Sequence, residues 1–145
     1  MELEANIEVF DYQMDSVSSA SIGWHVEHSL LVLNGIIDSI KVSDPSKFKW
    51  KFNFSKLYIF AIGRFPRGKG RAPKSVIPKE QIDQSNLSVQ LKLSMKNVGL
   101  LSTLDEGMFF KHPLFGNLKL RKSIYFLELH AEHHLKIIRE IVSGR

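Results

Sequence analysis

The sequence predicts an all-α fold, a four-helix bundle, from three observations. Apolar residues recur at spacings of three and four in four separate stretches, which is typical of helices that bury one face. Polar or turn-forming segments separate these stretches. The chain has 145 residues, of which 43% are hydrophobic and 24% charged, and this is enough for one core. We therefore predict a single domain over residues 1–145, with a long basic loop between the second and third long helices.

The first two helices are expected over residues 3–14 and 19–42. The apolar stripe of the first consists of Leu3, Ile7, Phe10 and Met14. The serine-rich stretch 16–21 separates the two helices, because serine hydroxyls satisfy free backbone N–H groups at turns and helix starts. The second helix ends before Pro45, since proline disfavours a helical conformation in the residue that precedes it.

The other two long helices are expected from residue 78 or 79 to 104 and from 119 to 142. Residues 55–62 fit either a short helix or a buried strand, because a short apolar run does not distinguish the two. Residues 64–78 hold three prolines, two glycines and five basic side chains, which predicts a loop. The segment 109–116 is expected to form a compact connection into the last helix.

The composition excludes several classes of protein. No cysteine is present, which rules out disulfides, thiolate metal sites and thiol catalysis and suits a reducing compartment. The N-terminus lacks the regions of a secretory signal, and no apolar run approaches the ~18–20 residues needed to cross a bilayer. We therefore expect a cytoplasmic protein with no membrane partner. The formal charge of +5 permits contact with anions.

The six histidines provide the main chemical signal. His130 and His134 are four residues apart, so they project from one face of the last helix together with its apolar residues. His28 lies on the apolar side of the second helix. Buried imidazoles need partners, either hydrogen-bonding groups of the core or a metal ion. Because three histidines from two facing helices leave coordination positions open, we predict one divalent ion (Zn, Ni, Fe or Mn) on these three residues.

The residues around these ligands are candidates for catalysis. Glu27 and Glu132 are interpreted either as solvated carboxylates or as a general base beside the metal. His133 is rotated away from the ligand face and is a further catalytic candidate, and His25 is rotated likewise. Each of these two is interpreted either as a hydrogen-bonding residue or as a ligand in place of its neighbouring candidate. His112 precedes a proline and is expected in a turn, where it serves either as an acid–base group or as a cap of the last helix.

Three segments carry a resemblance to a known family. They are Ser21 to His28, His112-Pro113-Leu114-Phe115-Gly116, and His130 to His134. Together they resemble the DinB-like superfamily of metal-binding four-helix bundles, and within it a small uncharacterised bacterial subgroup with a histidine-proline-x-phenylalanine-glycine loop. The resemblance implies an up-down-down-up bundle, a metal on the same three histidines and pairing into homodimers. It also implies an activity like that of thiol-dependent transferases or metal-dependent hydrolases.

The basic loop offers a candidate site for an anion. Arg64, Arg67, Lys69 and Arg71 are suited to phosphate or carboxylate, although a solvated loop has the same composition. The spacing from Gly63 to Lys69 approaches a phosphate-binding loop, but no serine or threonine follows the lysine and prolines preclude the helix. Nucleic acid is an unlikely partner because no recognised module is present.

These observations predict a metal-dependent enzyme of unknown substrate, either a hydrolase or a thiol S-transferase, that activates a water or a thiol. The substrate is expected to be a small molecule, anionic or a thiol. The alternative is a non-catalytic, metal-stabilised binding module that contacts an anionic partner through loop 64–74. The aromatic-rich segments 48–54 and 109–115 are interpreted either as the surface of a homodimer or as ordinary core.

Overall fold

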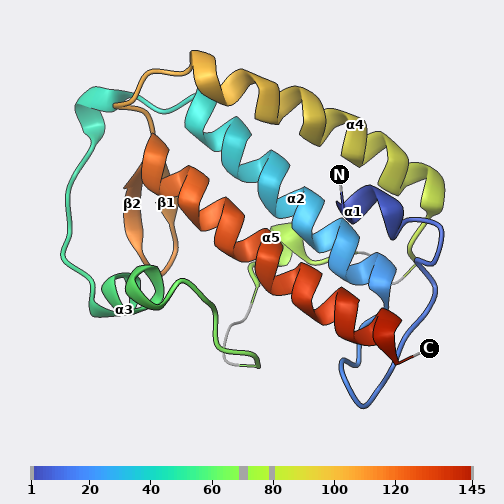
Figure 1. Cartoon of the computed structure of the whole chain (residues 1–145). Coiled ribbons are helices and arrows are strands. Elements are labelled where there is room, and N and C mark those ends of the chain that lie inside the picture. Colours follow the sequence, from blue (N-terminus) through green and yellow to red (C-terminus); the bar gives the residue numbers. More distant parts are fainter. Residues whose placement is uncertain (1, 69–71, 79–80, 145) are drawn as a thin grey trace.

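The computed structural model describes residues 2–68, 72–78 and 81–144 and is mostly helical (Figure 1). Its long helices are α2 (Ile22–Lys41), α4 (Gln84–Leu100) and α5 (Leu120–Ser143), with the shorter α3 (Phe54–Ile62) and the single turn α1 (Glu2–Ala5). Short 3-10 turns are η1 (Pro45–Lys47), η2 (Lys74–Val76) and η3 (Leu101–Thr103). An antiparallel hairpin pairs β1 (Phe109–His112) with β2 (Gly116–Lys119).

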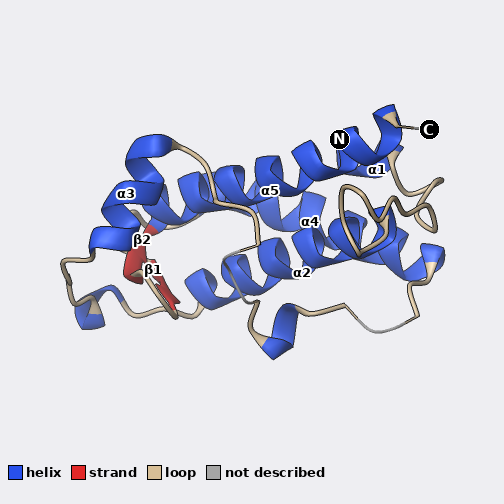
Figure 2. Ribbon diagram, turned by 90° about the horizontal axis from the view of Figure 1, so that it is seen from below, coloured by secondary structure: helices blue, strands red, loops and turns tan. Residues whose placement is uncertain are grey.

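Helix α2 is central and packs against both α4 and α5. Figure 1 shows that α2 and α4 run in the same direction and that α5 runs the opposite way. In Figure 2 the hairpin and α3 lie together at one end of the long helices. The predicted helical class is therefore confirmed, and four main helices pack together with a small hairpin. None of the described helices is long and apolar enough to cross a membrane.

The core is divided into two clusters along α2 and α5. One cluster lies near the start of α2 and includes Ile22, Val26, Leu30, Leu87, Ile138 and Ile141. The other lies near its end and includes Ile36, Ile37, Ile40, Phe115, Leu118 and Phe126. On α5, His130 and His134 fall between Leu127 of the second cluster and Ile137 of the first. The histidines thus occupy the level where the two clusters meet.

The helix predicted over residues 3–14 is wrong beyond Ala5, because residues 6–20 form turns. The reason is the start of α2, where the backbone N–H of Ile22 donates to the carbonyl of Tyr12 (2.9 Å) and that of Gly23 to the carbonyl of Phe10 (2.7 Å). The first N–H groups of a helix have no partner within it. To accept from these N–H groups, the carbonyls of Phe10 and Tyr12 must not already be bonded within a helix of their own. This tertiary contact therefore prevails over the helical pattern of the segment.

Local signals explain the structure of residues 54–62 and 109–116, two segments whose secondary structure the sequence did not determine. Residues 54–62 are helical, since the Asn53 side chain accepts from the backbone N–H of Lys56 (2.8 Å) and Gly63 ends the helix with a left-handed φ of 67°. The segment 109–116 contains β1 and the turn of a hairpin that was not predicted. His112 stabilises this turn, because its Nδ1 accepts from the backbone N–H groups of Leu114 and Phe115 (3.1 Å each).

Candidate metal centre

Helices α2 and α5 bring together the three histidines predicted as ligands. One ring nitrogen each of His28, His130 and His134 lies within 4.8 Å of the other two. Tetrahedral coordination at the usual metal–nitrogen distance places ligand nitrogens about 3.4 Å apart, so small side-chain rotations bring the three onto one ion. His28 and His134 are buried, while His130 is half-buried. The residues present therefore fit a divalent ion.

A backbone carbonyl fixes which nitrogen of His28 is free. Nδ1 of His28 lies 2.7 Å from the carbonyl oxygen of Val76, in the η2 turn. A carbonyl oxygen only accepts, so Nδ1 carries the proton and Nε2 keeps its lone pair. Metal-binding histidines commonly donate their second ring N–H in this way.

A second chain of hydrogen bonds acts on His134. Its Nδ1 lies 3.0 Å from Nδ1 of His25, and Nε2 of His25 lies 3.0 Å from the hydroxyl of Ser18. That hydroxyl also accepts from the backbone N–H of Ala20 (3.1 Å). When His25 donates to Ser18, its Nδ1 accepts from His134, and Nε2 of His134 is left with a lone pair. This tautomer is the one compatible with a metal ion.

Aromatic rings enclose the three histidines. Trp24 stacks on His28, with ring centroids 5.0 Å apart and an interplanar angle of 18°. Phe126 stacks on His130 at 5.9 Å, and the edge of Phe65 approaches His130 at 6.3 Å. Apolar walls of this kind limit the access of water and strengthen electrostatic interactions inside the centre.

Burial keeps the histidines of this centre neutral. It is the largest cause that lowers the pKa of His25 to about 4 and that of His130 to about 3. It also lowers the pKa of His28, and the pKa of His134 is lowered by burial and by the neighbouring histidines. Neutral imidazole is the form that binds a metal ion, so these rings need to lose no proton at neutral pH.

A cavity of about 410 Å³ lies beside the centre, between the loop that follows α3 and one side of α5. We call it the groove; its lining includes Tyr58, Ile62, Arg64, Phe65, Arg67, Leu129, Glu132, His133 and Lys136. His133 faces the groove, and its ring centroid is 5.1 Å from that of His134. Phe65 contacts both His133 and His130, so it lies at the boundary between the groove and the ligands.

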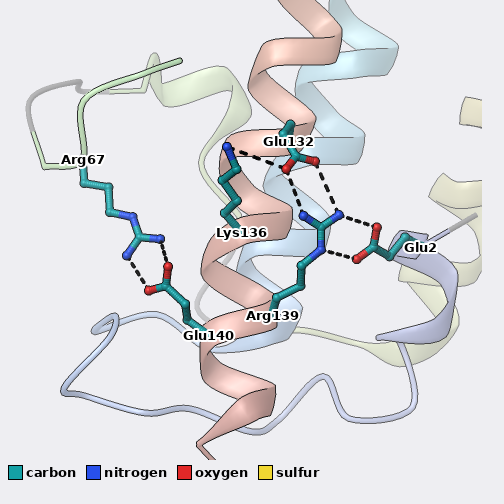
Figure 3. A network of polar contacts seen from close by, with 6 residues as sticks. All are labelled: Glu2, Arg67, Glu132, Lys136, Arg139 and Glu140. Carbon is teal, nitrogen blue, oxygen red and sulfur yellow. Dashed lines mark hydrogen bonds and ion pairs between the residues drawn. The ribbon is translucent and has the colours of Figure 1, made fainter. Parts of the chain in front are cut away.

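Ion pairs organise the walls of the groove (Figure 3). Arg67 forms two hydrogen bonds with Glu140, of 2.7 and 2.6 Å, which tie the loop to α5. Glu132 interacts with Arg139 (2.9 Å) and Lys136 (3.8 Å). Arg64 forms no ion pair with any described residue, so its charge is available in the groove.

The candidate catalytic residues are placed differently from one another. Glu27 is buried and accepts from Asn86 of α4 (3.1 Å), and Glu132 pairs with Arg139. His112 stacks on Phe115 at 4.3 Å in the hairpin, so it caps the turn of the hairpin and not the last helix. Among these candidates, His133 is the one with a described ring contact to a predicted ligand, His134, and a place in the groove lining. Of the predicted anion-binding residues, Arg64 and Arg67 line the groove, whereas Lys69 and Arg71 lie outside the described residues.

Two hydrogen-bond partners in this centre could not be identified from the sequence, the Val76 carbonyl beside His28 and Ser18 beside His25. The hydrogen bond to the Val76 carbonyl cannot be predicted from the sequence, because every residue has a backbone carbonyl. Ser18 stands seven residues before His25 in a segment predicted to be a turn, and nothing in its spacing signals a bond to that histidine. Of the two roles left open for His25, the structure shows hydrogen bonding, to His134 and Ser18.

Comparison with known proteins gave no match: no family model fits the chain, and neither a curated protein nor a solved structure is significantly similar to it.

Proposed function

We propose that this chain is a metal-dependent enzyme of the DinB-like kind, with α2, α4 and α5 arranged as the last three helices of an up-down-down-up bundle, that acts on a small anionic molecule or a thiol. The observation that carries the proposal is the convergence of three histidines within 4.8 Å on two helices. The partners of His28 and His134 leave the lone pairs of these rings free for an ion. Three protein ligands leave open positions, as in catalytic metal sites.

A bound divalent ion would supply the acidity that turns a water or a thiol into a nucleophile at neutral pH, or would polarise a carbonyl group. The groove supplies recognition. Arg64 and Lys136 attract the anionic end of a substrate, and Phe65 shields its reactive end from water.

His133 is the residue best placed to move a proton. It lines the groove, and burial lowers its pKa, so the ring is neutral at pH 7 and can accept a proton from a group held there. Glu27 is engaged with Asn86 and Glu132 with Arg139, which makes either a weaker candidate for the base.

The first test is elemental analysis of protein purified without a histidine tag. We expect about one equivalent of zinc, nickel, iron or manganese in the parent and little in His28→Ala or His134→Ala. His133→Ala is the matched control and should keep the metal, because His133 is not a ligand. A parent that holds no metal after incubation with each of these ions contradicts the proposal.

The second test concerns chemistry. The metal-loaded protein is assayed with panels of anionic esters, amides and thiol acceptors. We expect turnover that His133→Ala lowers by about 10²–10⁴ without loss of metal, as is typical for a general base.

A non-catalytic, metal-stabilised module is the competing function. A purely structural site should lose much of its thermal stability when the ion is chelated. The core clusters on both sides of the histidines make the fold independent of an ion, so we expect chelation to lower the melting temperature only moderately. Collapse of the fold on chelation favours the module.

A further inference from the structure

Helix α3 exposes an apolar stripe. Phe54, Leu57, Tyr58 and Ile62 recur at helical spacing, and this pattern normally marks the buried face of a helix. Their side chains are instead between 41% and 78% exposed. The opposite side of α3 packs on the core through Ile59, which is 7% exposed. The helix therefore carries apolar residues on its outer side that no described part of the chain covers.

The segment before α3 extends this stripe. Trp50 and Phe52 are 71% and 51% exposed, and the ring centroids are 6.3 Å apart for Trp50 and Phe52 and 4.8 Å for Phe52 and Phe54. Leu114 lies in the hairpin turn and is 68% exposed. It is held next to this segment, because its carbonyl accepts from the Asn53 side chain (2.7 Å). We call Trp50, Phe52, Phe54, Leu57, Tyr58 and Leu114 the apolar patch. Figure 1 shows α3 and the hairpin at one end of the molecule, away from α4.

Lysines surround the apolar patch. Lys49 and Lys51 alternate with its aromatic residues, and Lys56 lies on α3. Residues 45–79 contain ten Lys and Arg and no Asp or Glu. Among the described residues, none of these three lysines forms an ion pair. Apolar surface and unpaired positive charge are thus combined at one place.

We propose that the apolar patch and its lysines bind the surface of an anionic phospholipid bilayer. Aromatic and aliphatic side chains enter the boundary between headgroups and acyl chains, while lysine stems lie along it and place their ammonium groups at lipid phosphates. Each lysine near an anionic surface strengthens binding by about fivefold. The sequence-based expectation of no membrane partner rested on the lack of a spanning segment, which surface binding does not need. The inference is independent of the metal centre.

Two other occupants of the apolar patch are less well suited to it: a symmetric dimer because of its charge, and nucleic acid because of its aliphatic residues. In a symmetric dimer the same patch meets itself, so Lys49, Lys51 and Lys56 would face their own copies. Single-stranded nucleic acid stacks on aromatic rings but gives no reason for the exposed Leu57 and Leu114. A bilayer with negative headgroups satisfies both the apolar and the cationic part of the surface.

The test is sedimentation of the full chain with two kinds of vesicle at low salt: phosphatidylcholine alone, and phosphatidylcholine with one third phosphatidylglycerol. We expect binding to the anionic vesicles, little to the neutral ones, and a blue shift of tryptophan emission. The triple variant Trp50→Ser, Phe54→Ser, Leu57→Ser should lose the binding in the sedimentation assay. The matched control, Val89→Ser, Leu93→Ser, Met95→Ser, changes exposed residues of α4 and should bind as the parent does.

The charge contribution is measured with Lys49→Gln, Lys51→Gln, Lys56→Gln, for which we expect binding weaker by about a hundredfold. Circular dichroism should show that all variants keep the fold, because the replaced apolar side chains are largely exposed. Failure of the parent to bind anionic vesicles overturns the proposal. So does equal loss in the α4 control, or a concentration-dependent dimer that the patch variant abolishes while vesicles have no effect.

Discussion

Nδ1 of His25 lies 3.0 Å from Nδ1 of His134, so two buried imidazoles that are 109 residues apart share one proton. The contact links Ser18 to a predicted metal ligand through a continuous chain of hydrogen bonds. Groups of this kind orient a ligand ring and raise its basicity. His25 is therefore placed to act as a positioning residue of the candidate metal centre.

His25→Ala should weaken metal binding by about 10–100-fold, because His134 then loses the acceptor for its Nδ1 proton. Competition with a chromophoric zinc chelator measures the change. His133→Ala also removes a ring beside His134, 5.1 Å away, but no hydrogen bond of the described structure, and its affinity should stay near that of the parent. Equal weakening of metal binding in both variants would show that the packing of rings around His134, and not the hydrogen bond to His25, sets the metal affinity.

Acid should destabilise the metal-free protein. Burial lowers the pKa of His25 and His112 to about 4 and that of His130 to about 3, against 6.5 for an exposed histidine. Between about pH 6.5 and pH 3–4 the unfolded state binds more protons than the folded state. The free energy of unfolding therefore falls as the pH is lowered through this range, and these histidines leave it unchanged above about pH 6.5. Urea unfolding with a chelator, at several pH values, measures this slope.

His112→Asn provides the control for that slope. The asparagine side chain retains an acceptor for the turn but does not titrate. The variant should lose part of the pH dependence, and an unchanged slope would show that the pKa of His112 is not lowered by folding. His112 is suitable because it lies in the hairpin and is not a predicted ligand.

Two glycines of α2 should respond oppositely to alanine. A Cβ at Gly23 would lie 2.8 Å from the carbonyl oxygen of Phe10, so Gly23→Ala should destabilise the fold by about 1–3 kcal/mol. A Cβ at Gly35 meets nothing within 4 Å, so Gly35→Ala should stabilise it by about 0.5–1 kcal/mol. Denaturant unfolding of both variants checks the pair. A stabilising Gly23→Ala would mean that the turn at Phe10 is not packed on α2.

The pair of Arg67 and Glu140 should control the mobility of the loop that walls the groove. Glu140→Gln removes the negative charge and one of the two acceptor oxygens, and trypsin should then cleave after Arg64 or Arg67 faster than in the parent. The melting temperature should hardly change, because the pair is exposed. Lys41→Gln alters an equally exposed pair with Asp38 elsewhere and should leave cleavage unchanged.

The long helices and the clustering of His28, His130 and His134 could be predicted because they depend on local periodicity. The apolar stripe of α5 places His130 and His134 on one face wherever that helix packs, and Ser21 of the serine-rich stretch caps α2, which begins at Ile22 and not at the predicted residue 19. The turns over residues 6–20 could not be predicted, since they depend on which carbonyls reach the start of α2. The exposure of the apolar stripe of α3 could not be predicted either, because periodicity identifies the apolar side of a helix but not whether another part of the chain covers it.

The position of the histidines between the two core clusters also predicts how the protein opens. An ion on His28, His130 and His134 would join α2 to α5 at mid-length, while α4 is held to α2 by other contacts, including the buried pair Asn34 and Asn97 (3.0 Å). Partial unfolding that separates α4 breaks no bond to the ion. Backbone amide exchange with deuterium should therefore slow in the middle of α2 and α5 when metal is added and remain nearly unchanged in α4.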